Sequence, residues 1–238
     1  MPYQNMSLDA FARYVGMDAR DVRRQADRGL LPAKKIGGQW RFNRARVTEW
    51  LQQEMPGLDQ EQLRALDRAM GGRSPGEADE LLLTNFMGLE GIDLACQART
   101  KDSVLRELVK LAERTGLLYH ADDLLEAVMQ REEMCSTALA QGVAIPHPRQ
   151  VLPFVSAEPM VCLARLPRGI GFGAPDGGLT DIFFLICCHE DQHHLQILAR
   201  LVRVLGGDTI EELREVEQAG DALQLLIARE RAVIGLKA

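Results

Sequence analysis

The sequence lacks any long apolar run. No hydrophobic stretch approaches the roughly 18 residues of a membrane span, and the N-terminal MPYQNMSLDAF has no signal-peptide core. Cysteine is scarce: the chain has five, an odd number, and no two of them have C-x-x-C spacing. They are Cys96, Cys135, Cys162, Cys187 and Cys188. We therefore expect a reduced, cytoplasmic chain of 238 residues, in one large or two modest domains, without membrane contact.

Positive and negative charges are unevenly distributed along the chain. Residues 1–55 contain ten Lys and Arg against six Asp and Glu, whereas the remainder contains 18 against 28. The formal net charge of −6 thus combines a basic N-terminal part with an acidic body. This asymmetry predicts two modules with different partners, although a merely solvated basic surface would produce it as well.

Short helices and one hairpin are predicted in the N-terminal part. A helix capped by Ser7 is expected over 7–14, and a second helix extends from its cap Asp18 to Gly29. The run AKKIGGQWRF has two β-prone halves around a Gly-Gly pair, which is a two-residue hairpin signal. RARVTEWLQQ then resumes helical spacing.

This order of elements, in LDAFARYVGMDARDVRRQADRGLLPAKKIGGQWRF, resembles the excisionase/MerR-type winged helix-turn-helix DNA-binding domain. The resemblance implies that the second helix enters the major groove and that the hairpin is the wing. The charges agree, because Arg reads guanine bidentately while Lys and Arg neutralise phosphates. The candidate DNA-binding residues are Arg20, Arg23, Arg24, Lys35 and Arg41. The alternative is a protein–protein adaptor, a role that such domains sometimes have.

Residues 56–80 form the expected junction between the modules. An amphipathic connecting helix is predicted here, with Leu58, Leu63, Leu66 and Met70 along one stripe. The run GGRSPGEAD follows and is typical of a linker. A single small module makes few phosphate contacts, so we expect a homodimer, with the apolar stripe as its seam.

Helical and strand patterns alternate over residues 81–238. TKDSVLRELVKLAERTG, capped by Thr100, and ADDLLEAVMQREEM are predicted helices. The short apolar runs VAI, MVCLARL and DIFFLICC are predicted strands. HLQILARLVRVLGG is helical, and two further short helices are expected to end the chain. The mixture predicts an α/β domain.

One loop of this domain presents a histidine between two prolines, in GVAIPHPRQ. Proline fixes φ and restricts the preceding residue, so the backbone around His147 is held extended. Imidazole titrates near pH 6.5, which leaves a neutral nucleophilic nitrogen at cytoplasmic pH. A loop histidine taken alone is more often structural or idle than functional.

Three stretches change that balance. REEMCSTALAQGVAIPHPR (131–149), GIGFGAPDGG (169–178) and DIFFLICCHEDQHHLQILARLVRVL (181–205) together resemble the enzyme IIA domain of the fructose/mannitol/nitrogen-regulatory class of the phosphoenolpyruvate phosphotransferase system. The resemblance extends over residues 83–232 and implies the type 2 fold, a mixed sheet flanked by helices. It also implies that His147 accepts a phosphoryl group from a phosphorylated HPr-like carrier, and that His194 is the family's second histidine.

In phosphoryl transfer the protein mainly positions the reacting groups and neutralises the negative charge on the three oxygens of the phosphoryl group. The nearby donors in the sequence are Arg131, Arg149, Ser136 and Thr137. By the resemblance, His194 can hydrogen-bond the phosphoryl group at the start of a helix, whose N-terminus favours an anion. We place His147, His194 and Arg131 in the catalytic set and the other three residues in the phosphate-binding set, and we expect no cofactor.

The sequence departs from the family pattern at two places. Ala138-Leu139-Ala140 stands where the family has Gly-Ile-Gly, and Pro148 replaces the glycine that follows the active histidine. Both changes stiffen the loop, and Pro148 removes a backbone N–H that the family's glycine offers beside the phosphate. Slower phosphorylation, or a fold retained only for binding, is therefore an open alternative.

The run HEDQH (189–193) has the H-E-x-x-H spelling of zinc peptidases. That motif belongs inside a helix, whereas here the apolar strand reaches His189 and the helix is expected to begin around Asp191. Cys187 and Cys188 are more typical of packing than of metal ligation. We expect no metal site.

The sequence therefore predicts three segments. Residues 1–55 form a winged helix-turn-helix, 56–80 a connecting helix and linker, and 81–238 an enzyme IIA-like phosphotransfer domain. The expected function is regulation that couples phosphorylation state to DNA binding. The alternative is a phosphocarrier or binding module with a protein-binding N-terminal domain.

Overall fold

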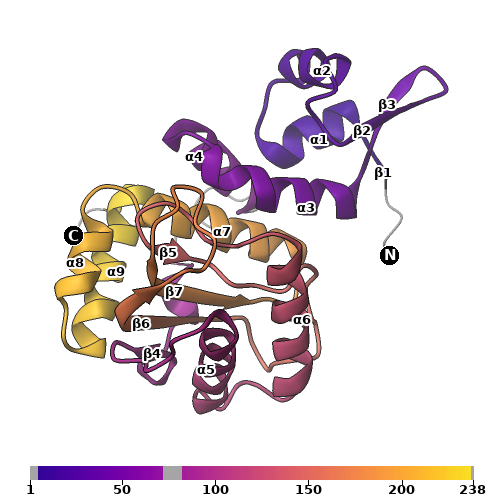
Figure 1. Cartoon of the computed structure of the whole chain (residues 1–238). Coiled ribbons are helices and arrows are strands. Elements are labelled where there is room, and N and C mark those ends of the chain that lie inside the picture. Colours follow the sequence, from indigo (N-terminus) through magenta and orange to yellow (C-terminus); the bar gives the residue numbers. More distant parts are fainter. Residues whose placement is uncertain (1–4, 72–81, 237–238) are drawn as a thin grey trace. The chain divides into compact units, whose positions relative to one another are not determined.

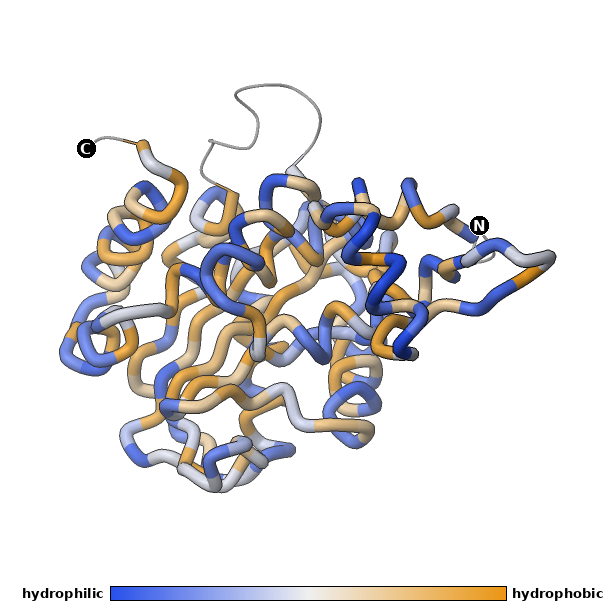
Figure 2. The backbone as a smooth tube through the Cα atoms, turned by 90° about the horizontal axis from the view of Figure 1, so that it is seen from above, coloured by the Kyte–Doolittle hydropathy of each residue, from blue (hydrophilic) through white to orange (hydrophobic). Residues whose placement is uncertain are grey.

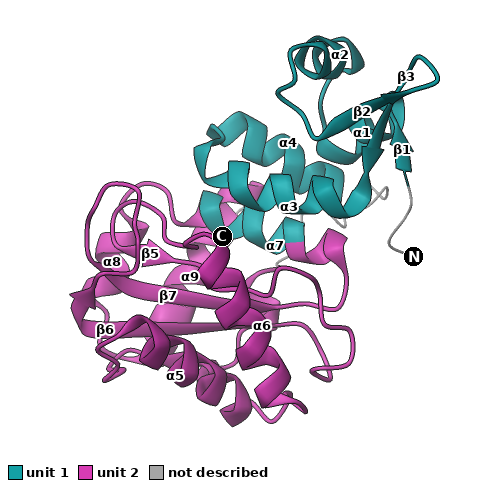
Figure 3. Ribbon diagram, turned by 45° about the vertical axis from the view of Figure 1, so that its right-hand side comes forward, with its two compact units in different colours: residues 1–80, 195–203 teal, residues 81–194, 204–238 magenta. Residues whose placement is uncertain are grey.

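The computed structural model describes residues 5–71 and 82–236, which form two compact units (Figure 1; Figure 3). The first unit comprises residues 1–80 and 195–203, and the second comprises 81–194 and 204–238. Most of the expected linker, residues 72–79, lies outside the described residues. No helix of the described chain combines the length and the apolarity needed to cross a membrane.

The first unit contains the expected helices and hairpin. Helices α1 (Leu8–Val15) and α2 (Ala19–Asp27) begin at side-chain caps, where Ser7 accepts from the Ala10 N–H and Asp18 from the Arg20 N–H. Strands β2 (Ala33–Ile36) and β3 (Gln39–Asn43) pair antiparallel around Gly37 and Gly38. Both turn residues have positive φ, 58° and 79°, which a two-residue primed turn requires and glycine adopts without strain.

Strand β1 (Asn5–Ser7) was not foreseen in the sequence. It pairs with the free edge of β3 and completes a sheet of order β1-β3-β2. Helix α3 (Arg44–Glu54) follows the hairpin. The core of the unit forms where Phe11 of α1 stacks on Phe42 of β3, with ring centroids 4.1 Å apart.

The connecting helix α4 (Gln60–Met70) is present, but its apolar stripe has a different use from the one expected. Leu63, Leu66 and Met70 are buried within the single chain. Helices α1 and α4 pack together, and a Cβ placed at Gly16 of the α1 cap would lie 2.6 Å from the Ala65 carbonyl oxygen. The stripe is thus part of the core of the unit, and its assignment as a dimer seam is wrong.

The second unit is the expected α/β fold, a mixed four-stranded sheet flanked by helices. The sheet has the order β4-β6-β7-β5, with β6 and β7 antiparallel and both outer pairs parallel. Its strands are β4 (Ile92–Asp93), β5 (Val143–Ala144), β6 (Met160–Ile170) and β7 (Thr180–Cys187). The long central strands are mainly apolar (Figure 2), as expected for strands buried on both faces.

Helices α5 (Lys101–Arg114) and α6 (Ala121–Met134) join one apolar cluster with alternate residues of β6 and β7. Thr100 caps α5 as expected. Helices α7 (Asp191–Val204), α8 (Thr209–Glu215) and α9 (Ala219–Ile234) follow β7. The sequence interpretation missed the two-residue β4 and expected α9 to be short, whereas it has 16 residues.

Candidate functional site

The loop before His147 is held against the edge of β7. Short strand β5 runs parallel to β7, and beyond it the Pro146 carbonyl oxygen accepts a hydrogen bond of 3.0 Å from the Ile186 N–H. On its other side, the Ile145 N–H donates to the Thr137 carbonyl oxygen at 3.1 Å. The backbone is therefore fixed by pairing up to the residue before the histidine.

The ring of His147 is almost fully enclosed, with 3% of the residue exposed. Its Nδ1 lies 2.7 Å from the Ile145 carbonyl oxygen. A carbonyl oxygen only accepts hydrogen bonds, so this contact assigns the proton to Nδ1 and the lone pair to Nε2. Nε2 is buried and has no hydrogen-bond partner among the described residues. The fold thus presents a neutral ring with its nucleophilic nitrogen unoccupied.

His194 lies beside this ring, in the first turn of α7. The two ring centroids are 5.0 Å apart with an interplanar angle of 54°, and only 2% of His194 is exposed. Burial, followed by the charge of Arg131, lowers the pKa of His194 to about 4. Burial, followed by the charges of His194 and Arg131, lowers the pKa of His147 well below its usual value. Both rings are therefore neutral at pH 7.

Arg131 is buried near the C-terminal end of α6. Its guanidinium donates a hydrogen bond of 2.7 Å to the Cys135 carbonyl oxygen and contributes to the lowered pKa of both histidines. The structure thus gathers the three residues of the expected catalytic set around one buried locus. A fixed positive charge beside two neutral rings is suited to an incoming anion.

The expected phosphate-binding hydroxyls make contacts of their own. The Ser136 hydroxyl donates to the Phe172 carbonyl oxygen at 2.8 Å, and Thr137 donates its N–H and hydroxyl to one oxygen of Glu132 at 2.9 and 2.6 Å. Arg149 is exposed beyond the loop. The hydroxyls hold the segment before the histidine, and their role toward a phosphate stays a prediction.

Glu132 and Lys101 are site residues that the sequence interpretation missed. The other Glu132 oxygen pairs with the Lys101 ammonium at 2.7 Å, and this ammonium lies 4.8 Å from the centroid of the Phe172 ring. The Glu132 side chain is only 2% exposed, so the buried carboxylate fixes Thr137 to α6. The available signal was the Arg-Glu pair of REEM, of which only the arginine was used.

The residues that depart from the family pattern belong to this ordered loop. Ala138 forms a β-bridge with Ala144, and the Leu139 N–H donates to the Val143 carbonyl oxygen at 2.8 Å. The turn between them needs Gly142, whose φ is 82° and whose missing Cβ would lie 2.5 Å from an Arg214 nitrogen. The loop is therefore a tight hairpin-like turn. Pro148, directly after the histidine, is buried.

The HEDQH run does not adopt zinc-peptidase geometry. Helix α7 begins at Asp191, so His189 precedes the helix, and its Nε2 lies 3.0 Å from the Ser156 hydroxyl. His193 is about half exposed. Over residues 5–71 and 82–236, no three His, Cys, Asp or Glu side chains gather in a group that suits a metal ion.

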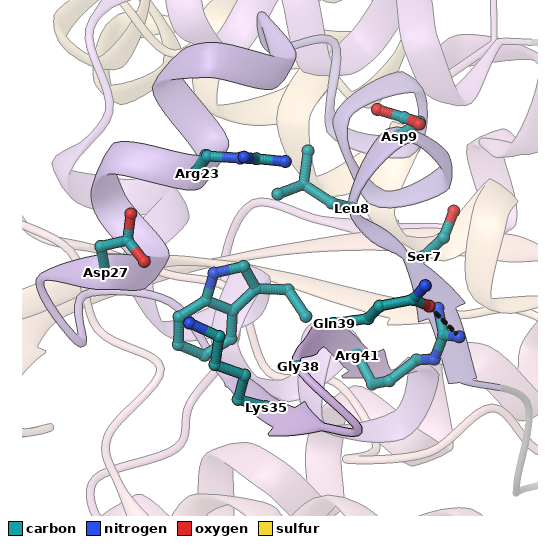
Figure 4. Close-up of a pocket in the computed structure, with 10 residues that line it drawn as sticks. Ser7, Leu8, Asp9, Arg23, Asp27, Lys35, Gly38, Gln39 and Arg41 are labelled. Atoms are coloured by element: carbon teal, nitrogen blue, oxygen red, sulfur yellow. Dashed lines mark hydrogen bonds between the residues drawn. The ribbon is translucent and has the colours of Figure 1, made fainter.

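The basic N-terminal residues lie on α2 and on the hairpin. Arg20, Arg23 and Arg24 are exposed on α2, while Val22 and Ala26 face the core as expected. A pocket of about 460 Å³ opens between the helix and the hairpin (Figure 4). It brings together Arg23, Lys35 and Arg41, whereas Arg20 and Arg24 do not line it.

Comparisons with known proteins agree with this arrangement. The family model described as "Phosphoenolpyruvate-dependent sugar phosphotransferase system, EIIA 2" matches residues 85–228. The chain belongs to this family. A model described as a helix-turn-helix domain matches residues 6–55, so a helix-turn-helix domain precedes the EIIA domain.

Relatives and solved structures of EIIA proteins are similar over the same part of the chain. A nitrogen regulatory protein of Bradyrhizobium diazoefficiens is 34% identical over 149 residues, which cover 61% of this chain and 94% of that protein. A fructose-specific EIIA component of Haloferax volcanii is 33% identical over 138 residues, covering 57% and 88%. The crystal structure of nitrogen regulatory protein IIA-Ntr from Neisseria meningitidis aligns with TM-score 0.55 and 28% identity, covering 61% of this chain and 99% of that one.

Proposed function

We propose that this EIIA protein accepts a phosphoryl group on Nε2 of His147 from a phosphorylated HPr-like carrier, and that the state of this histidine regulates its helix-turn-helix domain. The observation that carries the proposal is the ring itself. Its Nδ1 is committed to the Ile145 carbonyl oxygen, while its Nε2 is buried without a partner among the described residues. An unsatisfied buried acceptor is costly unless the site uses it.

The proposed transfer is a single displacement at phosphorus. The Nε2 lone pair of His147 forms a bond to the phosphorus atom as the bond from phosphorus to the carrier's nitrogen breaks, and that electron pair stays on the carrier. The proton on Nδ1 remains in its hydrogen bond to Ile145. The carbonyl dipole thereby stabilises the positive charge that the ring gains as it is phosphorylated.

His194 and Arg131 are the proposed assistants. Arg131 supplies the positive charge that a phosphoryl group needs, and His194 lies in the first turn of α7, where the helix N-terminus favours an anion. The other candidate donors to the phosphoryl oxygens are Ser136, Thr137 and Arg149. Because Nε2 is covered in this structure, transfer requires a local displacement of the residues over the ring, which favours slow phosphorylation in line with the stiffened loop.

The proposed output is binding of duplex DNA through the helix-turn-helix domain. Exposed arginines on α2 and the cations of the hairpin supply phosphate and guanine contacts of the kind such domains use. We keep the homodimer as part of this proposal, since a second module multiplies the contacts. Its seam has to lie elsewhere than on the buried stripe of α4.

Helix α7 is the proposed route between the phosphorylation site and the DNA-binding domain. It is one continuous helix that begins with the turn of His194, and its residues 195–203 group with the first unit. There Arg200 donates two hydrogen bonds to Asp67 of α4 at 2.6 and 2.9 Å, and Arg203 donates to the same carboxylate. A shift of α7 on phosphorylation would therefore act on the helix that follows the DNA-binding domain.

The alternative function is a phosphocarrier whose N-terminal domain binds protein. One solved structure with this fold is a complex of the mannitol enzyme IIA of Escherichia coli with phosphorylated enzyme IIB, with TM-score 0.52 and 23% identity. That likeness shows the fold alone. Onward transfer from phosphorylated His147 to an EIIB protein, with no binding of DNA in either state, would favour the alternative.

Mass spectrometry tests the phosphorylation. After incubation with phosphoenolpyruvate, enzyme I and an HPr-like carrier, we expect one acid-labile phosphate on the wild type and on the His193→Gln control. The His147→Gln variant should carry none, and His194→Gln should label about 10-fold more slowly if it removes a contact worth roughly 1.4 kcal/mol. Undiminished labelling of His147→Gln would reject the acceptor.

Binding to a pool of random duplexes, at two salt concentrations and with and without phosphorylation, tests the output. Salt-dependent binding that changes with phosphorylation supports the proposal. Absent or salt-insensitive binding in both states would reject DNA as the partner, and equal binding in both states would reject the coupling alone.

A further inference from the structure

The pocket between α2 and the hairpin carries an inference that rests on the proposed DNA binding. Its walls come from the N-terminal part of α1, from α2 and from both strands of the hairpin (Figure 4). Three cations line it, namely Arg23, Lys35 and Arg41, each from a different element. The pocket is therefore assembled by the tertiary fold and not by one helix face.

The charges that line the pocket have a defined balance. Two carboxylates, Asp9 and Asp27, accompany the three cations, which leaves a formal charge of +1. A backbone phosphodiester of DNA carries one negative charge, whereas phosphomonoesters and nucleotide polyphosphates carry more at neutral pH. The balance matches a single phosphodiester.

Two of the cations are held in place by neighbouring hairpin residues. The Lys35 ammonium lies 5.5 Å from the ring centroid of Trp40, directly across the hairpin, where the two residues are paired in register. The Arg41 guanidinium donates a hydrogen bond of 2.7 Å to the Gln39 side chain. A cation over an indole face is attracted by the ring quadrupole, so a flexible lysine is kept at the pocket.

We propose that this pocket holds one backbone phosphate of bound duplex DNA, with Arg23, Lys35 and Arg41 as its donors, and that Trp40 is the residue that positions Lys35. Trp40 itself does not need to contact a base. Its effect on binding passes through Lys35, which distinguishes it from a recognition residue.

A double-mutant cycle on the full chain tests the proposal, with binding to a random 20-base-pair duplex pool measured by fluorescence anisotropy over a series of salt concentrations. Loss of one phosphate contact lowers the slope of log K against log salt by about 0.9, or affinity by roughly 8-fold at 0.1 M salt. Arg23 and Arg41 remain at the pocket when Lys35 is removed, so we expect a loss of up to this size from Lys35→Ala. We expect an equal loss from Trp40→Leu, which keeps apolar bulk without a ring face. The double variant should lose no more than either single variant.

Two further variants serve as controls. Trp40→Phe retains an aromatic face and should bind nearly as the wild type does. Lys34 lies on the same strand outside the pocket, so losses from Lys34→Ala and Trp40→Leu should add. Thermal unfolding of each variant verifies that the hairpin is intact. If Trp40→Leu is unfolded, Trp40→Ile, a β-branched residue that suits a strand and has no ring face, takes its place in the cycle with the same expected outcomes.

The outcomes separate the inference from the function on which it rests. Salt-dependent binding by the wild type with an unchanged Trp40→Leu slope, or with additive losses for Trp40 and Lys35, would overturn the pocket assignment alone. No binding by the wild type at low salt would reject the DNA function together with the pocket.

Discussion

Burial of two neutral histidines should make the EIIA domain less stable in mild acid. The folded chain holds His194 with a pKa of about 4, whereas an unfolded chain protonates histidine near pH 6.5. The stabilising contribution of the neutral ring is therefore complete above pH 6.5 and is lost as the pH falls from 6.5 through about 4. At about 1.4 kcal/mol per pH unit, the loss is on the order of 3 kcal/mol.

The perturbation that isolates this contribution is His194→Gln. Removing His194 also removes one cause of the lowered pKa of His147, so both effects act in the same direction and flatten the pH dependence. The His193→Gln variant controls for the loss of one histidine on the same helix, since its side chain is about half exposed. The informative quantity is the difference in pH slope, because a change that is constant with pH reflects packing alone.

Urea unfolding at half-unit pH steps, followed by far-UV circular dichroism, measures the free energy of unfolding. Tryptophan fluorescence does not serve here, because both tryptophans, Trp40 and Trp50, lie in the first unit. Titration of the imidazole C–H signals by NMR reports the pKa directly. Parallel stability curves for wild type and His194→Gln between pH 6.5 and 4, or a His194 midpoint near 6.5, would refute the reasoning.

Two further predictions concern stability. Asp67→Asn leaves Arg200 and Arg203 buried without their carboxylate, so the free energy of unfolding of the first unit should fall by roughly 3–5 kcal/mol. Urea unfolding followed by tryptophan fluorescence measures it. A loss below 1 kcal/mol, no larger than that of the exposed control Glu61→Gln, would contradict the stabilising role of Asp67. Gly142→Ala should cost about 2 kcal/mol or more, since it adds a steric clash to a left-handed backbone. The Gly116→Ala control has φ 72° but open space around its Cβ position, so equal losses in the two would contradict the steric argument.

The sequence by itself determined the local elements of this protein. Side-chain caps act within three residues, so Ser7, Asp18 and Thr100 marked helix starts that the structure confirms. The Gly-Gly pair marked the hairpin because a two-residue turn also depends only on adjacent residues. The prolines around His147 and the three stretches that resemble the family identified the EIIA domain. Residues of one loop are neighbours in the sequence, so their motif is visible before the fold is known.

The tertiary structure decided everything that depends on distant partners. The Ile145 carbonyl oxygen that holds the Nδ1 proton of His147 is only two residues away, but the loop is fixed by its pairing with β7, and the second histidine, His194, comes from α7. Strands β1 and β4 have two or three residues and exist only because a longer strand pairs with them. Periodicity marked the apolar stripe of α4 but not its partner, and Asp67 meets Arg200 and Arg203 over more than 130 residues of chain. Pairing over such separations depends on packing of the whole unit, which no local pattern encodes.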